Sequence, residues 1–391
     1  MGFLLKTVRE AHPDLTFSTS ESALAETLDS IRRELPPHMA QGEAWRHLAK
    51  INPVFADGHL LVALPDWRAD TAAHLAAGGV LFPFELTFDA QGRPVIEAAL
   101  GGGASDLAGA RIVEIDGVPG ESVTATLLAR THGDTPALRS ALLAQRWWLY
   151  HWKVIGASTQ YRLVLERDGR RWPLVAPGSA TLPRVLQIEA DVNRLFRLET
   201  TPGGTALMTI NTFLSTHQAH FLAFTRDAFA RLRAEGVNRL VIDISGNGGG
   251  DDSMWLEGLM PYLAKTPYRT GSTAVKRVLR ANPERGEQVG QIVHSQIETW
   301  RPPQPDNPAL FTGKVEVRIG PMTYSSSVLF ANVMQDFGFA TLVGTGNAAR
   351  RTQSGGIYSV TLPHSGLKLW LPRFVLAPPS GDRKDALLEA R

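Results

Sequence analysis

The sequence has no cysteine among its 391 residues. Structural disulfides, thiol catalysis and cysteine-based zinc sites are therefore excluded. No apolar run reaches about 18 residues, so the sequence predicts no helix that spans a membrane. No basic run reaches five residues and the formal net charge is only +2, so a nucleic-acid partner has little support. With 43% apolar and 20% charged residues, the composition indicates a globular protein of two or three domains.

The N-terminal region is predicted to be helical. Apolar residues recur every three or four positions from Leu24 to Leu35, which is typical of one helical face. Ser20 is a suitable N-cap for this helix, and a second helix is expected over 41–50. The first twelve residues contain no apolar stretch of the kind found in a secretion signal. The two predicted helices together indicate a helical segment over residues 1–52.

The middle of the chain is predicted to form short strands and turns. Residues 53–80 contain a tight Asp-Gly turn that is followed directly by His59. The stretch GARIVEIDGVPGESV, which begins at Gly109, resembles the core of a PDZ domain, and a strand pair follows at 159–177. We expect a PDZ-like, β-rich module over 81–180, of the kind that binds an extended peptide at a sheet edge.

Strands and helices alternate in the C-terminal half, 181–391. A near-continuous apolar strand is predicted over 239–245, and a strand at 315–320 leads into a helix at 326–337. Repeated strand–helix–strand units imply an α/β core with a mainly parallel sheet covered on both faces. Residues 270–312 are rich in proline and are expected to be irregular.

Two of the predicted strand ends carry residues suited to acyl transfer. One places Ser325, Ser326 and Ser327 where a strand passes into a helix, beside unpaired N–H groups and the positive end of the helix dipole. The other is a glycine run that includes Gly248 and Gly249, which lets the backbone approach a ligand closely. Together they could supply a nucleophile and an oxyanion hole, although serines at such junctions are also ordinary helix caps.

Other motifs provide a candidate general base for the serine, or suggest a metal site, a nucleotide site or a peptide groove instead. His59 stands at a tight turn with apolar neighbours and is the candidate base, whereas His217 and His220 have a weak metal spacing without a third ligand. The glycines of 344–349 fit a nucleotide-binding pattern, but neither a helix nor a suitably placed acidic residue follows them. The aromatic cluster 147–152 is either internal packing or a wall of a peptide groove.

The motifs, taken in order, resemble those of the C-terminal-processing (tail-specific) peptidases and the tricorn protease core. The resemblance rests on Asp-Gly-His, the PDZ-like segment, LVIDISGNGGG and TYSSSVLFANVMQDFGFATLVG, and it covers about residues 50–365. It implies a ClpP/crotonase-like core and a serine peptidase that acts on polypeptides without a metal or organic cofactor. The family's serine lies three residues before a position usually held by glutamate; Val328 occupies that position here, so Ser325 would be the nucleophile.

The resemblance also distinguishes two branches of the family. Tail-specific members carry a lysine base 25 residues after the serine, where this chain has Arg350, which keeps its proton near pH 7. Tricorn-like members pair the serine with an earlier histidine, so His59 would be the general base for Ser325. The N–H of Ser326 and that of Gly248 or Gly249 would then form the oxyanion hole.

The resemblance leaves several points open. Asp382 and Asp385 are both candidates for the acid that orients the base. Asp336 would be structural, because it lies about three helical turns, roughly 16 Å, from the nucleophile. Ser326 and Ser327 remain alternative nucleophiles. The valine at 328 and the arginine at 350 also fit an inactive homologue that binds a peptide or an apolar ligand. Relatives are commonly exported, which favours a periplasmic or extracellular location, and the oligomeric state stays open.

Overall fold

The fold was obtained as a computed structural model, which describes residues 2–201, 203–345, 349–381 and 386–390. The chain divides into two compact units. Unit 1 comprises Met1–Arg9, Leu15–Ala190 and Tyr358–Leu371, and unit 2 comprises Glu10–Asp14, Asp191–Ile357 and Pro372–Arg391. The division of the chain into 1–52, 53–80, 81–180 and 181–391, expected from the sequence, stays a prediction.

The first helices form where the sequence predicts them. The side chain of Ser20 accepts a hydrogen bond from the amide of Ala23 at the start of α2, and the apolar face of this helix is buried. Residues near His59 were expected to be extended, but a helical turn, α4, precedes the Asp-Gly turn and only a two-residue strand follows it. The reason is Pro53, which fits the first turn of a helix and disfavours a strand interior. The helices that lie wholly or mostly in unit 1 are α1 (Gly2–Ala11), α2 (Glu21–Glu34), α3 (Gln41–Leu48), α4 (Asn52–Phe55), α5 (Trp67–Ala76), α6 (Gly120–Leu128), α7 (Pro136–Gln145), α8 (Trp147–Val154) and α9 (Arg184–Ala190).

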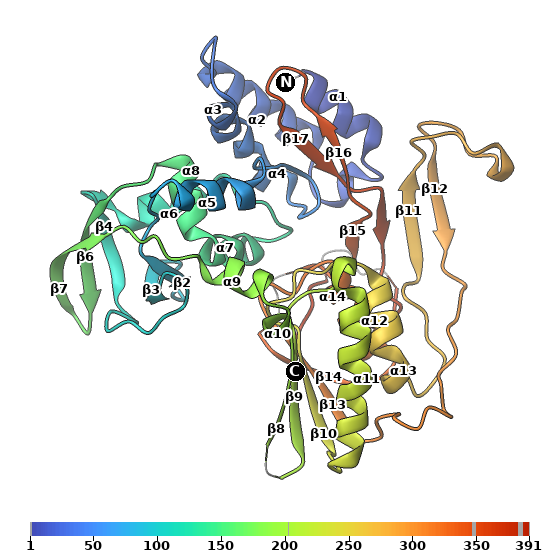
Figure 1. The fold of residues 1–391 in the computed structure, drawn as a ribbon. Coiled ribbons are helices and arrows are strands. Elements are labelled where there is room, and N and C mark those ends of the chain that lie inside the picture. The colour runs from blue at the N-terminus through green and yellow to red at the C-terminus, as the bar shows by residue number, and fades with distance from the viewer. Residues whose placement is uncertain (1, 202, 346–348, 382–385, 391) are drawn as a thin grey trace. The chain divides into compact units, whose positions relative to one another are not determined.

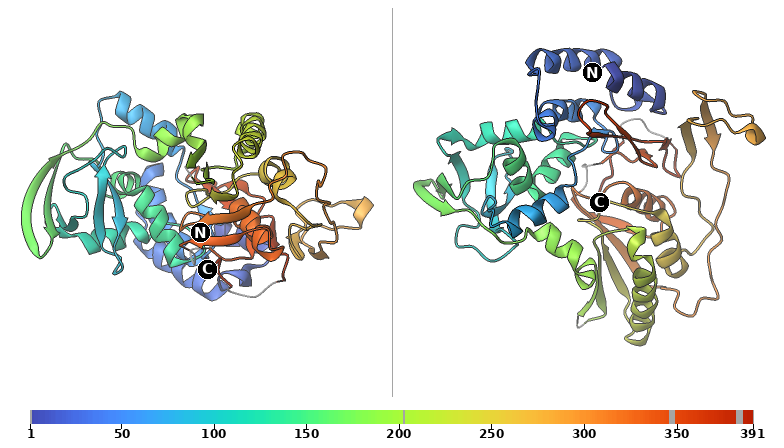
Figure 2. Two further views of the ribbon diagram at one scale, coloured as in Figure 1. Left: turned by 90° about the horizontal axis from the view of Figure 1, so that it is seen from below. Right: turned by 45° about the horizontal axis from the view of Figure 1, so that its top comes forward.

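Unit 1 contains an antiparallel sheet in the order β2-β3-β4-β6-β7, with the short strand β5 beside β4. Its strands are β2 (Phe84–Phe88), β3 (Pro94–Ala99), β4 (Arg111–Ile115), β5 (Val118–Pro119), β6 (Gln160–Arg167) and β7 (Arg170–Pro177). Both Asp-Gly turns have a positive φ at each residue, with values of 50° and 80° at Asp116-Gly117 and 53° and 75° at Asp168-Gly169. Such turns match the twist of the strands they join, and the β6–β7 hairpin is the strongly curved green ribbon in Figure 2. The strand pair expected at 159–177 is therefore confirmed.

A second sheet of unit 1 joins segments that are far apart in sequence. Strand β1 (Leu61–Val62) pairs antiparallel with β17 (Lys368–Leu371), which in turn pairs with β16 (Tyr358–Thr361). Leu61 lies opposite Trp370 in this register. A pairing across some 300 residues leaves no local trace in the sequence and was not predicted.

Unit 2 is built on a five-stranded sheet in the order β14-β13-β10-β9-β8. The bounds are β8 (Phe196–Thr201), β9 (Thr205–Ile210), β10 (Arg239–Asp243), β13 (Lys314–Ile319) and β14 (Thr341–Gly344). The last four run parallel to one another and only β8 is antiparallel, so the expected mainly parallel sheet is confirmed. Helices of the same unit lie beside it (Figure 1): α10 (Val192–Leu195), α11 (Gln218–Ala234), α12 (Asp252–Gly258), α13 (Met260–Leu263) and α14 (Ser326–Asp336).

A second, antiparallel sheet of unit 2 has the order β12-β11-β18-β15. It consists of β11 (Thr273–Arg277), β12 (Ile292–Gln296), β15 (Gln353–Gly355) and β18 (Phe374–Leu376). The expectation that 270–312 is irregular is therefore wrong in part. Strand β11, the first strand of this segment, pairs with β18, which lies about a hundred residues away in the sequence, and Val275 is opposite Val375.

Helix α14 runs through the core of unit 2. Its first nine residues, Ser326 to Met334, are all buried, and a helix that is buried on every side must be apolar or small all round. No helix among the described residues is both long and apolar enough to cross a lipid bilayer.

Candidate active site

Ser325 occupies the junction between the loop after β13 and the first turn of α14. Its backbone angles are φ 56° and ψ −126°, a conformation that costs a residue with a side chain on the order of 1–3 kcal/mol and persists only where its surroundings impose it. The amide of Ser325 donates to Oε1 of Gln353 at 3.1 Å. The Nε2 of Gln353 in turn donates to the carbonyl of Arg350 at 2.6 Å. A buried carboxamide thus holds the strained serine.

The glycine run packs directly against this serine. A Cβ added to Gly249 would lie 2.7 Å from the Cβ of Ser325 and 2.8 Å from the carbonyl of Tyr324. Gly249 has φ 98°, and its amide donates to Oδ1 of Asn247 at 2.9 Å. The Nδ2 of Asn247 donates to the carbonyl of Ile210 at the end of β9. Only glycine fits this position, because a side chain would displace the serine and strain the backbone.

The two glycines predicted as oxyanion donors differ in whether their amide N–H already donates a hydrogen bond within the protein. The amide of Gly249 is already engaged by Asn247. Within the described ranges, the amides of Gly248 and Ser326 donate to no protein acceptor, and Gly248 is exposed. We therefore carry Gly248, rather than Gly249, forward as the glycine donor.

The three serines lie in different surroundings. Ser325 alone of the three is partly exposed. The Oγ of Ser326, which is buried, donates to a carboxylate oxygen of Asp252 at 2.5 Å. Ser327 is fully buried, and its Oγ has no hydrogen-bond partner among the described residues. Burial therefore favours Ser325 over the two alternative nucleophiles.

His59 lies in unit 1, after the turn that follows α4, and its side chain is buried. Its amide donates to Oδ1 of Asp57 at 2.7 Å, while its Nδ1 is 4.0 Å from the same oxygen. The amide of Gly58 donates to Oδ1 of Asp134 at 3.0 Å. Burial lowers the pKa of His59, and the carboxylate of Asp57 offsets part of this shift. The imidazole is therefore neutral near pH 7, as a general base must be.

A second histidine, His132, is close enough to His59 for the two side chains to interact electrostatically. His132 precedes the loop of Asp134, and burial, with a contribution from the positive charge of Arg146, lowers the pKa of His132 to about 3. Sequence reasoning named neither Asp57, Asp134 nor His132 as part of this site. The signal for Asp57 was its place in the Asp-Gly-His turn, whereas the other two lie some 75 residues away with no local pattern. His59 and Ser325 belong to different units, so their pairing stays a prediction.

Several other predicted residues can be placed. Asp336 accepts a hydrogen bond from Arg351 Nη2 at 2.5 Å and another from the amide of Ser380 at 3.0 Å, which agrees with a structural role. Asp382 and Asp385 lie outside the described residues, as do residues 346–348 of the nucleotide-type motif.

The aromatic cluster of α8 is internal packing within unit 1. Trp147, Trp148 and Tyr150 are buried, and the ring of Trp147 lies 6.2 Å from that of Phe82 and 6.2 Å from that of Phe88. These contacts favour packing over the alternative of a groove wall.

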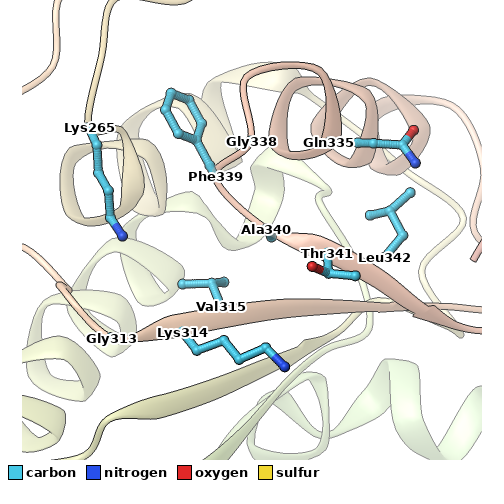
Figure 3. A pocket seen from close by; sticks show the side chains of 10 residues that line it. All are labelled: Lys265, Gly313, Lys314, Val315, Gln335, Gly338, Phe339, Ala340, Thr341 and Leu342. Atoms are coloured by element: carbon cyan, nitrogen blue, oxygen red, sulfur yellow. The ribbon is translucent and has the colours of Figure 1, made fainter. Parts of the chain in front are cut away.

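A cavity of about 350 Å³ lies in unit 2 at the far end of the parallel sheet from Ser325. It is lined by the first residues of β13 and β14, whereas Ser325 follows the last residue of β13. Figure 3 shows Lys265 and Lys314 approaching it from different segments. Catalytic sites of open α/β sheets lie at the carboxyl ends of the strands, so this cavity is distinct from the candidate active site. Within the described ranges, no cluster of three or more acidic or histidine side chains is arranged to hold a metal ion.

A strained serine at a strand-to-helix junction, beside glycine amides at the carboxyl end of a parallel sheet, is the arrangement expected of a site for acyl transfer. Residues 204–381, which include this whole junction, match the description "Peptidase family S41". This part of the chain, 204–381, belongs to peptidase family S41, a family of serine peptidases. No curated protein matches the sequence.

Solved structures with a similar fold include two of CPAF. The structure of mature CPAF complexed with lactacystin is 14% identical, with a TM-score of 0.66, and the match covers 100% of this chain and 91% of that one. A serine-to-alanine mutant of CPAF is also 14% identical, with a TM-score of 0.67 and coverage of 100% and 90%. At this identity the likeness shows that the folds are similar.

Proposed function

We propose that the protein is an endopeptidase that hydrolyses unfolded or C-terminally accessible polypeptides through an acyl-enzyme on Ser325. The observation that carries the proposal is the positive φ of Ser325, held by Gln353 and packed against Gly249. A residue is kept in such a conformation at a cost, and this occurs mainly where function requires it.

In the proposed reaction, neutral His59 accepts the proton of the Ser325 hydroxyl while Oγ attacks the carbonyl carbon of the scissile bond. The negative charge on the carbonyl oxygen is stabilised by the N–H groups of Gly248 and Ser326. When the C–N bond breaks, His59 gives its proton to the leaving amine. A water molecule, deprotonated by His59, then hydrolyses the ester and regenerates the serine.

A separate module of the chain would deliver the substrate to the peptidase core. We assign a ClpP/crotonase-like peptidase core to 181–391 and a PDZ-like module to 81–180, which contains the curved β6–β7 hairpin. A module of this kind would hold an extended polypeptide by adding it to a sheet edge.

The proposal is tested with a fluorophosphonate probe and an unfolded protein substrate. The probe should label Ser325, identified by mass spectrometry. Ser325→Ala should abolish cleavage without changing the melting temperature, and His59→Ala should abolish cleavage while the protein still unfolds cooperatively, at a lower temperature because the side chain of His59 is buried. Ser327→Ala is the matched control, because this neighbouring hydroxyl is fully buried and has no partner among the residues that the structure describes, and it should cleave at the wild-type rate. Lactacystin, which is bound in a similar CPAF structure, serves as a second probe of the same serine.

Cleavage by Ser325→Ala at the wild-type rate would refute the nucleophile assignment. A wild-type protein that binds unfolded polypeptides but neither cleaves them nor reacts with the probe would instead be a binding homologue without catalysis.

A further inference from the structure

A partly buried carboxyl group lies directly behind the predicted oxyanion hole and has no part in the proposed reaction. Asp252 is the first residue of α12, two residues after the glycine run. Its Oδ1 accepts a hydrogen bond from Ser326 Oγ at 2.5 Å and one from Trp255 Nε1 at 3.2 Å. The same indole N–H also donates to Ser326 Oγ at 3.0 Å. The three side chains thus form a closed triangle, which we call the Asp252 triangle.

The Asp252 triangle joins the two elements that carry the oxyanion donors. Asp252 and Trp255 belong to α12, which continues the chain from Gly248, whereas Ser326 is the first residue of α14. Trp255 is fully buried and Ser326 is only 2% exposed, so the bond between these two side chains is shielded from water, whereas the two bonds to Asp252 are partly buried. Oδ1 of Asp252 accepts a hydrogen bond from Ser326 on α14 and another from Trp255 on α12, so it links side chains of both elements.

An oxyanion hole depends on the relative position of its donors. Two N–H groups stabilise the developing charge only if both point at the place that the oxygen will occupy, and a displacement of about 1 Å can cost roughly a hundredfold in rate. The amide of Ser326 moves with its own side chain, and the Oγ of that side chain is fixed by Asp252 and Trp255.

We propose that Asp252 is a positioning residue that sets the place of the Ser326 amide in the oxyanion hole by binding the Ser326 hydroxyl. This inference rests on the proposed function, because it presupposes that Ser325 is the nucleophile. Asp252 contacts neither substrate nor the reacting atoms; it acts through Ser326.

The unfavourable setting of this carboxyl group supports a dedicated role. Burial raises the pKa of Asp252, and the charge of neighbouring Asp251 raises it further, while its hydrogen bonds from Ser326 and Trp255 act in the opposite direction. A negative charge near a site where an oxyanion develops is also unfavourable by Coulomb's law. To hold the Ser326 hydroxyl, the side chain at position 252 must accept a hydrogen bond, but it need not be charged. A substitution that removes the acceptor and one that removes only the charge should therefore have different effects.

The test compares Asp252→Ala with Asp252→Asn, using a quenched fluorescent peptide for kcat and KM and the fluorophosphonate probe for the rate of serine modification. Alanine removes the acceptor, so we expect kcat and the modification rate to fall about 10- to 100-fold with KM within about twofold of wild type. Asparagine keeps an oxygen for Ser326, so its kcat should stay within about threefold of wild type. Asp251→Asn is the matched control, because the adjacent exposed Asp251 only caps α12 and asparagine caps equally well.

The outcomes separate this inference from the proposed function. Wild-type kcat in Asp252→Ala, or a rise in KM alone, would overturn the positioning role while Ser325→Ala remains inactive. An active Ser325→Ala would instead overturn the proposed function itself. If Asp252→Ala shows no cooperative thermal unfolding, Ser326→Ala takes its place, because it removes the hydroxyl but keeps the amide. That variant should show the same loss of kcat at unchanged KM, and wild-type kcat there would also overturn the inference.

Discussion

The close contact between Gly249 and Ser325 predicts a large effect from a single methyl group. In Gly249→Ala, the new Cβ would meet the Cβ of Ser325 at 2.7 Å, the carbonyl of Tyr324 at 2.8 Å and the amide of Ser326 at 3.0 Å. Two of these three atoms belong to the backbone, so no rotation of a flexible side chain relieves the overlap. The variant must move either the glycine run or the nucleophile.

The magnitude has two parts. A residue with a Cβ at a positive φ costs about 1–2 kcal/mol, and overpacking of a close-packed site costs about 1–3 kcal/mol more. We therefore expect the free energy of unfolding to fall by roughly 2–5 kcal/mol. Displacement of Ser325 from its reactive position should also lower the rate of modification by a fluorophosphonate about a hundredfold.

Urea unfolding followed by tryptophan fluorescence measures the first effect, and the labelling rate measures the second. The neighbouring glycine supplies the stability control, because a Cβ at Gly248 would meet nothing within 4 Å and its φ is not in the left-handed region. Gly248→Ala should therefore stay within about 1 kcal/mol of wild type. Equal stability of Gly249→Ala and Gly248→Ala, together with a wild-type labelling rate in Gly249→Ala, would refute the packing described here.

Three further predictions follow from buried polar groups. Gln353→Ala should lower kcat about tenfold or more, because the amide of Ser325 loses its acceptor; Gln353→Glu, measured beside it, should recover part of the rate. Arg351→Met should lower the free energy of unfolding by about 3–5 kcal/mol, because the 8%-exposed carboxylate of Asp336 loses its guanidinium partner and keeps only the amide of Ser380; urea unfolding measures it. Burial lowers the pKa of His151 to about 4, so the unfolded chain binds the proton more readily. Stability is then complete above pH 6.5 and is lost as the pH falls toward 4, by about 2 kcal/mol at pH 5; His151→Phe should lose this dependence in urea unfolding compared across that range.

Much of the parallel sheet could be predicted because its signals are local. The apolar run of β10 and the serine-rich junction before α14 each lie within about ten residues, and their periods and breaks report directly on the structure. The turns at Asp116-Gly117 and Asp168-Gly169 were predictable for the same reason, since few residues accept two successive positive φ values.

The supports of the nucleophile could not be predicted, because they depend on contacts between distant segments. Gln353 binds the amide of Ser325 from 28 residues away, in a three-residue strand too short to have a pattern. Asp252 reaches Ser326 across 74 residues. Both side chains are ordinary in composition, and only the pairing of β15 with β18 and the packing of α12 against α14 bring them to the site.

The two sheets of unit 2 make different contributions to the same serine. Ser325 lies beyond the end of β13, where the loop enters α14. The backbone angles of that residue require a partner from outside the parallel sheet, and the antiparallel sheet supplies it through Gln353 on β15. The segment that carries Gln353 is attached to α14 near both ends of the helix, since Arg351 binds Asn332 and Asp336 farther along it. A shift of α14 would therefore move the serine and its acceptor together. That coupling explains how β15, the buried edge strand of the small antiparallel sheet, lets the strain at Ser325 persist in the folded protein.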